Sequence, residues 1–215
     1  MYVPVHNQVD DPEEAWAFVK AHPFAVLCVN GPDGPVIAHV PLVVRYDEAI
    51  GSHELIGHIA RANPFHAAVA SEGGPCVAVF RGPDAYVSPS LYPSKQIHGK
   101  VVPTWAYLAA EARGHLVVET DPRAMRAYLE PATQDMEAGA AKPWTVDDAP
   151  VDYISTLERG IVGLKIRVTT LIAKRKINQG KPQADYQSVQ QAFAASALTS
   201  HQLLSHEMQK ESQKT

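Results

Sequence analysis

A chain of 215 residues with 46% hydrophobic and 20% charged residues fits a globular protein with a sizeable core, and excludes a disordered or fibrous one. The formal net charge of −4 gives no overall drive toward nucleic acid, and no apolar run approaches the length of a membrane span. Pro4, His6 and Asn7 interrupt any apolar core near the start, so we expect no signal peptide and a cytoplasmic protein. Cys28 and Cys76 lie inside apolar strand patterns and are expected to be reduced.

The first part of the chain alternates apolar runs with cap and turn residues. We expect, in chain order, a helix over residues 10–22, strands over 24–29, 36–44 and 55–59, and a short helix over 63–70. The first helix is indicated by an aspartate pair and a proline ahead of Trp16 and Phe18. A Gly-Pro-Asp-Gly turn at 31–34, between two apolar runs, indicates a β-hairpin.

The second part continues this pattern of short elements. We expect strands over 77–81, 85–87, 101–112, 114–119, 161–168 and 172–177, helices from Asp121, over 133–137 and over 148–159, and one amphipathic helix from Asp185 with a frayed tail at 209–215. Many short strands separated by turn residues are typical of a barrel, so we expect an α+β, mainly β, barrel with peripheral helices and a C-terminal helix. The change in composition near its end divides the chain into a barrel domain, 1–180, and a helical extension, 181–215.

The segment 57–64, Gly-His-Ile-Ala-Arg-Ala-Asn-Pro, has the chemistry of an anion site. It ends an apolar strand and opens a helix, with Asn63 as a preferred N-cap and Pro64 as a preferred first helical residue. Free backbone N–H groups and the positive end of the helix then point toward His58 and Arg61, where a phosphate would fit. The alternative is an ordinary strand-to-helix turn with a solvated arginine.

A second segment, 86–107, concentrates hydroxyl groups, aromatic rings and Lys95 between prolines. Pro89, Pro93 and Pro103 stiffen it, because proline fixes φ. A stiff loop loses little entropy on ordering, which favours a binding surface. The alternative is a proline-rich connection that packs on the barrel.

Signatures of other chemistries are missing from the sequence. The ten histidines do not have metal-ligand spacing, and no Gly-x-Ser-x-Gly elbow, phosphate-binding Walker loop or dinucleotide fingerprint occurs. We therefore expect no metal site, and no residue stands out as a general acid or base, which leaves any catalytic residue unassigned.

Taken together, the separated motifs resemble the PaiB-like family of FMN-binding proteins, which are described as negative transcriptional regulators. The resemblance covers most of the chain and is carried by residues 1–4, 38–42, 57–64, 86–90, 102–105 and 161–163. Two positions depart from the family pattern: Ala106 stands where the family has Asn, and Leu91 where it has Trp.

This resemblance implies a split β-barrel, like that of pyridoxamine 5'-phosphate oxidase, with FMN bound at a homodimer interface. It implies that 39–42 border the flavin ring, that His58, Arg61 and Asn63 surround the phosphate, and that the 86–107 segment completes the partner's site. The cofactor-binding residues expected are His39, Val40, Pro41, Leu42, His58, Ile59, Ala60, Arg61, Asn63, Tyr92, Lys95, Thr104, Trp105 and Tyr107. The alternative for the aromatic residues is core or interface packing.

The function implied by the resemblance is a flavin-dependent negative transcriptional regulator. The alternatives are an FMN-dependent oxidoreductase acting on a small molecule, and an FMN carrier without turnover. Besides the homodimer, the partners expected are DNA or a regulatory protein, and no membrane. Contact with DNA would be weak and local, at Lys174, Arg175, Lys176 and Lys181, and the alternative for this run is a solvated face.

Overall fold

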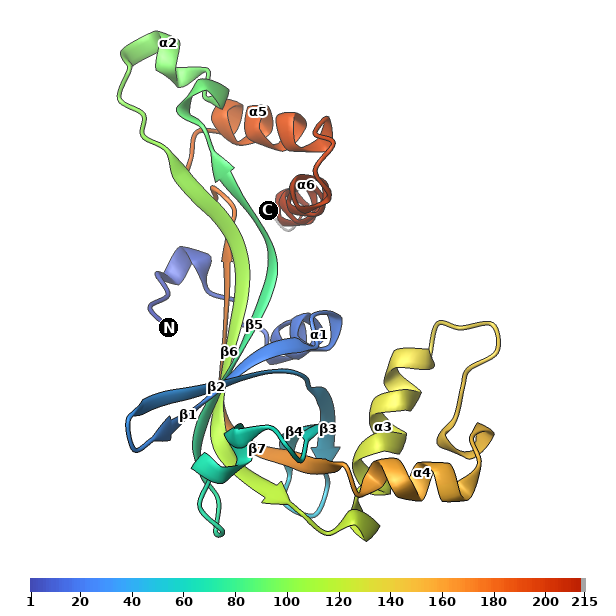
Figure 1. Cartoon of the computed structure of the whole chain (residues 1–215). Coiled ribbons are helices and arrows are strands. Elements are labelled where there is room, and N and C mark those ends of the chain that lie inside the picture. Colours follow the sequence, from blue (N-terminus) through green and yellow to red (C-terminus); the bar gives the residue numbers. More distant parts are fainter. Residues whose placement is uncertain (214–215) are drawn as a thin grey trace. The chain divides into compact units, whose positions relative to one another are not determined.

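A computed structural model describes residues 1–213. Seven strands form one sheet in the order β2-β1-β5-β6-β7-β4-β3 (Figure 1). The strands are β1 (Phe24–Gly31), β2 (Gly34–Pro41), β3 (Val43–Asp47), β4 (Ser52–Ala60), β5 (Gly74–Val87), β6 (Thr104–Glu119) and β7 (Ile161–Lys176). The α+β fold class expected from the sequence is confirmed by this sheet and its flanking helices.

Helices occur between the strands and after the last one. They are α1 (Pro12–Ala21), α2 (Ser94–His98), α3 (Arg126–Glu137), α4 (Val151–Glu158), α5 (Gln183–Ala194) and α6 (Thr199–Ser212). Short 3-10 turns are η1 (Val5–Asn7), η2 (Pro64–Ala68), η3 (Pro89–Leu91), η4 (Pro122–Ala124) and η5 (Val146–Asp148). Within residues 1–213, no helix combines the length and apolar character needed to cross a membrane.

The connection between β2 and β3 closes the sheet. These strands lie at its two opposite edges, yet only Leu42 separates Pro41 from Val43 in the sequence. Because one residue bridges only a few ångströms, the two edges must meet, and the sheet curls into a barrel. Gly57 of β4 faces this connection, and a Cβ atom on it would lie 2.5 Å from the carbonyl oxygen of Pro41.

Contacts divide the chain into two units. The barrel unit contains Trp16–Phe80 and Glu111–Leu171, and the second unit contains Met1–Ala15, Arg81–Ala110 and the chain from Ile172 onward. The barrel core is made by apolar side chains that alternate along the strands, as expected for strands buried on one face. Those with at most 1% exposure include Ala25, Leu27, Val40, Leu42, Leu55, Ala78, Phe80, Leu116, Leu164 and Ile166. The division at residue 180 expected from the sequence stays a prediction.

The second unit has its own small core between α5 and α6. Val189 and Phe193 of α5 and Leu204 of α6 are buried, and the Tyr186 hydroxyl donates to the carbonyl of Met208 at 2.8 Å. Figure 1 shows these two helices side by side at the end of the chain. Their packing makes the C-terminal region a helical pair.

Several expected boundaries are wrong. The predicted turns at Gly82-Pro83 and Arg113-Gly114 lie inside the continuous strands β5 and β6. Gly114 permits a close approach rather than a turn, because a Cβ atom there would collide with the backbone of Arg167. Residues 133–137 do not start a helix, since they end α3.

The C-terminal prediction also needs correction. The single helix expected from Asp185 is two helices, since Leu198 is extended between them with φ −84° and ψ 121°. Residues 209–212, expected to fray, belong to α6, and the last two residues of that tail lie outside the described part of the chain.

We predict that Gly57→Ala destabilises the protein, because the added methyl group meets the Pro41 backbone, which cannot rotate away. Overpacking of this kind costs about 1–3 kcal/mol, which lowers the melting temperature by several degrees in a chain of this size. The matched control is Gly139→Ala, where a Cβ atom meets nothing within 4 Å. Equal melting temperatures for the two variants would contradict the close contact at the barrel seam.

Candidate functional site

The 57–64 motif forms the end of β4 and a short turn. The Asn63 side chain accepts a hydrogen bond from the Phe65 N–H at 2.9 Å, so the predicted N-cap is confirmed. The helix after it is not the expected one, since η2 is a 3-10 helix of five residues, 64–68. A turn this short has little of the dipole on which the anion site was argued.

Arg61 holds three segment ends together. Its Nε donates to the carbonyl of Arg159, and its Nη2 donates to the carbonyls of Thr120 and Ile161, each at 2.9 Å. Its backbone N–H donates to the carbonyl of Gly160 at 2.8 Å. The guanidinium therefore joins the end of β4 to the end of β6 and the start of β7. Its expected role toward a phosphate stays a prediction.

His58 faces an apolar pocket of about 310 Å³ in the barrel unit. The pocket is lined by Pro41, Val43, Gly57, His58, Ala132, Thr133, Met136, Glu137 and Trp144. Burial lowers the pKa of the His58 imidazole below its usual 6.5, so the ring is neutral at pH 7. A neutral imidazole beside apolar walls offers one donor and one acceptor and no charge.

Helix α3 supplies the outer wall of this pocket. Arg45 of β3 forms a two-pronged ion pair with Asp135 of α3, at 2.8 and 3.2 Å, and also donates to the carbonyl of Pro131. Tyr128 of α3 and Val43 of β3 belong to one buried apolar cluster. The pocket is therefore bounded on one side by the β2 and β4 backbone and on the other by an anchored helix.

The structure brings together Pro41, which was expected to border the ring, and His58, which was expected at the phosphate. Sequence reasoning missed Met136 and Trp144, because nothing near them in the sequence signals a pocket that forms only when α3 packs on β4. The one hint available in the sequence was a large apolar residue, Trp144, in a polar stretch.

The other expected residues of the barrel unit are placed differently. Val40, Leu42 and Ile59 are buried in the core, with at most 6% exposure. His39 is exposed and stacks on Phe24 with a centroid distance of 6.2 Å, and Ala60 is exposed at the end of β4.

Of the expected residues in the second unit, three lie apart from the rest. Tyr92 is 2% exposed, so its ring packs in the core rather than offering a free face. Lys95 is exposed on α2. Trp105 is 49% exposed and donates from its Nε1 to Asp84 at 2.9 Å. Ala106, which replaces the family's Asn, is buried and needs no polar partner there.

Thr104 and Tyr107 meet two lysines of β7. Lys176 donates to the Thr104 hydroxyl at 2.8 Å, and its ammonium lies 5.9 Å from the centroid of the Tyr107 ring. Lys174 lies 5.1 Å from the same centroid. We call Lys174, Lys176, Thr104 and Tyr107 the lysine cluster.

Arg175, between the two lysines, is ion-paired with Glu14, Glu207 and Glu211. Its side chain is 12% exposed, and Lys174 is 8% exposed. Lys174 and Arg175 are therefore not part of a solvated face, whereas Lys176 and Lys181 are partly exposed. Contact with DNA at this run stays a prediction.

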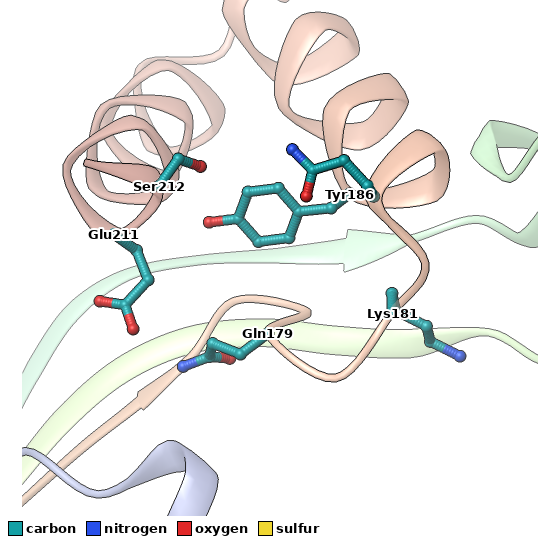
Figure 2. Close-up of a pocket in the computed structure, with 6 residues that line it drawn as sticks. Gln179, Lys181, Tyr186, Glu211 and Ser212 are labelled. Carbon is teal, nitrogen blue, oxygen red and sulfur yellow. The ribbon is translucent and has the colours of Figure 1, made fainter. Parts of the chain in front are cut away.

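A polar pocket of about 410 Å³ also lies in the second unit. Figure 2 shows the Tyr186 ring pointing toward Glu211 and Ser212 of α6, with Gln179 and Lys181 on the segment that precedes α5. None of the cofactor-binding residues expected from the sequence lines it.

Solved structures with this fold are flavoproteins and related chains. The FAD and heme binding protein of Mycobacterium smegmatis matches with a TM-score of 0.58 and 17% identity, over 85% of this chain and 79% of that one. The flavocytochrome Anf3 of Azotobacter vinelandii matches with a TM-score of 0.57 and 12% identity, over 86% and 78%. At these identities the likeness shows the fold, which is the split barrel of flavin-binding proteins.

The family is shown by sequence. Residues 1–170 match the family described as "Putative FMN-binding domain", and the chain belongs to this family. FMN is thus its cofactor. "Protease synthase and sporulation protein PAI 2" of Bacillus subtilis is 29% identical over 191 residues, covering 88% of this chain and 87% of that protein. "Uncharacterized protein AN0679" of Emericella nidulans is 29% identical over 208 residues, covering 81% and 83%.

The residues present have the chemistry that FMN requires. A flavin ring needs an apolar wall with a few hydrogen-bonding groups, as in the His58 pocket. In the second unit, taken by itself, the lysine cluster offers two ammonium groups and a hydroxyl, which are groups suited to a phosphate.

We predict that Arg61→Ala destabilises the fold by on the order of 2 kcal/mol, because three backbone carbonyls lose a charged donor. Thermal melts without ligand measure the loss. Arg123→Ala is the control, since that side chain is 90% exposed and pairs with its neighbour Asp121, and its melting temperature should not change. If Arg61→Ala is as stable as wild type, Arg61 does not stabilise the fold and is free to bind a ligand.

We predict a pH dependence of stability that comes from His58. Its folded pKa lies below the unfolded value of 6.5, so the unfolded chain binds the proton first. This contribution is complete above pH 6.5 and is lost as the pH falls from 6.5 through the folded pKa. When the pH is lowered from about 7.5 to about 5.5, the free energy of unfolding measured in urea should therefore decrease less for His58→Gln than for wild type. The exposed His206→Gln is the control, and parallel curves for all three proteins would refute the assignment.

Proposed function

We propose that the His58 pocket receives the isoalloxazine ring of FMN. The observation that carries this proposal is the pocket itself: Pro41 and His58 line it together with Met136 and Trp144, and its volume is about 310 Å³. Ligand pockets in proteins are typically concave and mostly apolar, with a few placed polar groups. His58 is the placed polar group here, and its neutral ring can donate to or accept from the edge of a flavin.

Bound there, FMN would supply one- and two-electron redox chemistry. The protein's part is to hold the ring and to keep water from it. The pocket backbone at Pro41 and Gly57 is rigid, because the barrel seam permits no side chain at 57. Trp144 and Met136 line the pocket on the side of α3, where they would contact the ring.

We also propose that two copies of the chain form a homodimer. The support is a set of large apolar side chains exposed on the 86–107 segment: Tyr86 at 50%, Ile97 at 81%, Val102 at 67% and Trp105 at 49%. Exposed apolar groups gathered on one segment mark interaction surfaces in soluble proteins. The second copy would cover them.

For the biological role, we propose a flavin-dependent negative regulator. This proposal is supported by the similarity to PAI 2 of Bacillus subtilis, whose name refers to protease synthesis and sporulation. Because Lys174 and Arg175 are largely buried, we infer that regulation works through a protein or small-molecule partner rather than through a DNA contact at this run. A cytoplasmic location is supported by the two free cysteines, Cys28 and Cys76.

Native mass spectrometry of freshly purified protein tests the cofactor and the dimer together. We expect two chains of 23.4 kDa each with bound flavin, and the flavin released on denaturation should have the mass of FMN. Recovery of FAD would sink the assignment of this chain's cofactor. If the protein is a monomer and retains FMN, the proposed homodimer is not required for FMN binding.

A salt titration of DNA binding tests the proposed route of regulation. Four solvent-exposed cations on phosphates would give a slope of log K against log salt near −3.6 for duplex DNA. With Lys174 and Arg175 largely buried, at most Lys176 and Lys181 can reach phosphates, so we expect a slope no steeper than about −1.8. A steep slope would return DNA to the list of partners. Rapid turnover of a reduced nicotinamide by the FMN-loaded protein would instead favour the oxidoreductase alternative.

A further inference from the structure

Two ammonium groups share one face of β7 in the second unit. Lys174 and Lys176 are two residues apart, so their side chains leave the strand on the same side. Both approach the ring of Tyr107, at 5.1 and 5.9 Å from its centroid. Two like charges thus leave the same side of the strand and approach one aromatic ring.

The burial of Lys174 makes this arrangement costly in the free protein. Its side chain is 8% exposed, and its ammonium donates to the carbonyl of Tyr2 at 3.2 Å. The rings of Tyr2 and Tyr107 add cation–π contacts at 5.9 and 5.1 Å. A carbonyl and two rings carry no net negative charge, so the buried positive charge is solvated only in part.

The carboxylates near this strand form ion pairs with Arg175 rather than with the two lysines. Arg175 projects to the opposite face, where it pairs with Glu14, Glu207 and Glu211. Within residues 1–213, no carboxylate lies within ion-pair distance of the Lys174 or Lys176 ammonium. The positive charge of the lysine cluster is therefore unneutralised by the chain.

We propose that the lysine cluster is a binding site for a phosphate monoester dianion. A phosphate monoester carries a charge of about −1.5 to −2 at pH 7 and offers three strong acceptor oxygens. Two ammonium groups match this charge. The residues that these ammonium groups contact, Thr104 and Tyr107, each carry a hydroxyl group. A single carboxylate would neutralise one of the two lysines.

Two sources can provide this chemistry: the phosphate of FMN, and a second phosphate-bearing molecule represented by inorganic phosphate. The inference depends on the unpaired lysines and stands whether or not the His58 pocket holds a flavin ring. Comparison of FMN with riboflavin, which lacks the phosphate, identifies the source.

The experiment uses the full chain and three variants: Lys174→Met, Lys176→Met and the double variant. Methionine keeps the length of the side chain and removes the charge. The control is Lys181→Met, which removes a lysine of the same unit that lies over the ring of Tyr92 at 5.1 Å. Without ligand, Lys174→Met should melt at or above the wild-type temperature, because an unneutralised buried charge is removed.

Melts with inorganic phosphate and titrations with both flavins then measure the ligand. We expect phosphate to raise the melting temperature of wild type and of Lys181→Met, and not that of the double variant. If FMN is the source, the double variant should bind FMN roughly ten- to a hundredfold more weakly, with riboflavin unchanged. If phosphate still stabilises wild type alone while both flavins bind all variants equally, the site serves a second phosphate ligand.

Two results overturn the inference. One is equal stabilisation of wild type and the double variant by phosphate, which places the anion elsewhere. The other is no stabilisation of wild type together with unchanged FMN binding in the double variant. If wild type binds neither flavin, the proposed flavin pocket is refuted. The phosphate melts still test the lysine cluster in that case.

Discussion

The structure depends on the seam where the barrel closes. Strands β2 and β3 occupy opposite edges of the sheet, and one residue, Leu42, connects them. This short link forces the sheet to curl, and it places the backbone of Pro41 against β4. Gly57 is required at that crossing because any side chain would meet the Pro41 carbonyl. The same crossing forms the floor of the His58 pocket, so the geometry of the pocket is a consequence of closure.

Charge is distributed in opposite ways in the two units. In the barrel unit the cations at the candidate site act on the protein's own backbone: Arg61 donates to three carbonyls, and Arg45 binds Asp135 and the Pro131 carbonyl of α3. In the second unit Arg175 is satisfied by three glutamates, while its neighbours Lys174 and Lys176 have none. The function of each residue in a run of three basic residues therefore cannot be inferred from the sequence until it is known which face of the strand the residue lies on.

Sequence reasoning identified the fold class and most elements because alternation, caps and prolines are local signals. The Asn63 cap and the α1 start were correct for that reason. It failed where an outcome depends on distant partners. Gly114 suggested a turn, but the glycine serves the approach of β7. The acceptors of Arg61 could not be predicted, because they come from residues 120, 159 and 161, which no local pattern reveals.

Arg61 also determines how this part of the barrel opens. Its three acceptors lie at the end of β6, after α4 and at the start of β7, and its own N–H bonds to Gly160. Segment ends normally fray one at a time, each with its own small free energy. Here one planar group holds three of them, so an opening at any end breaks the bonds of the others. The region therefore behaves as a single cooperative unit, and its amide protons should report one common free energy of opening.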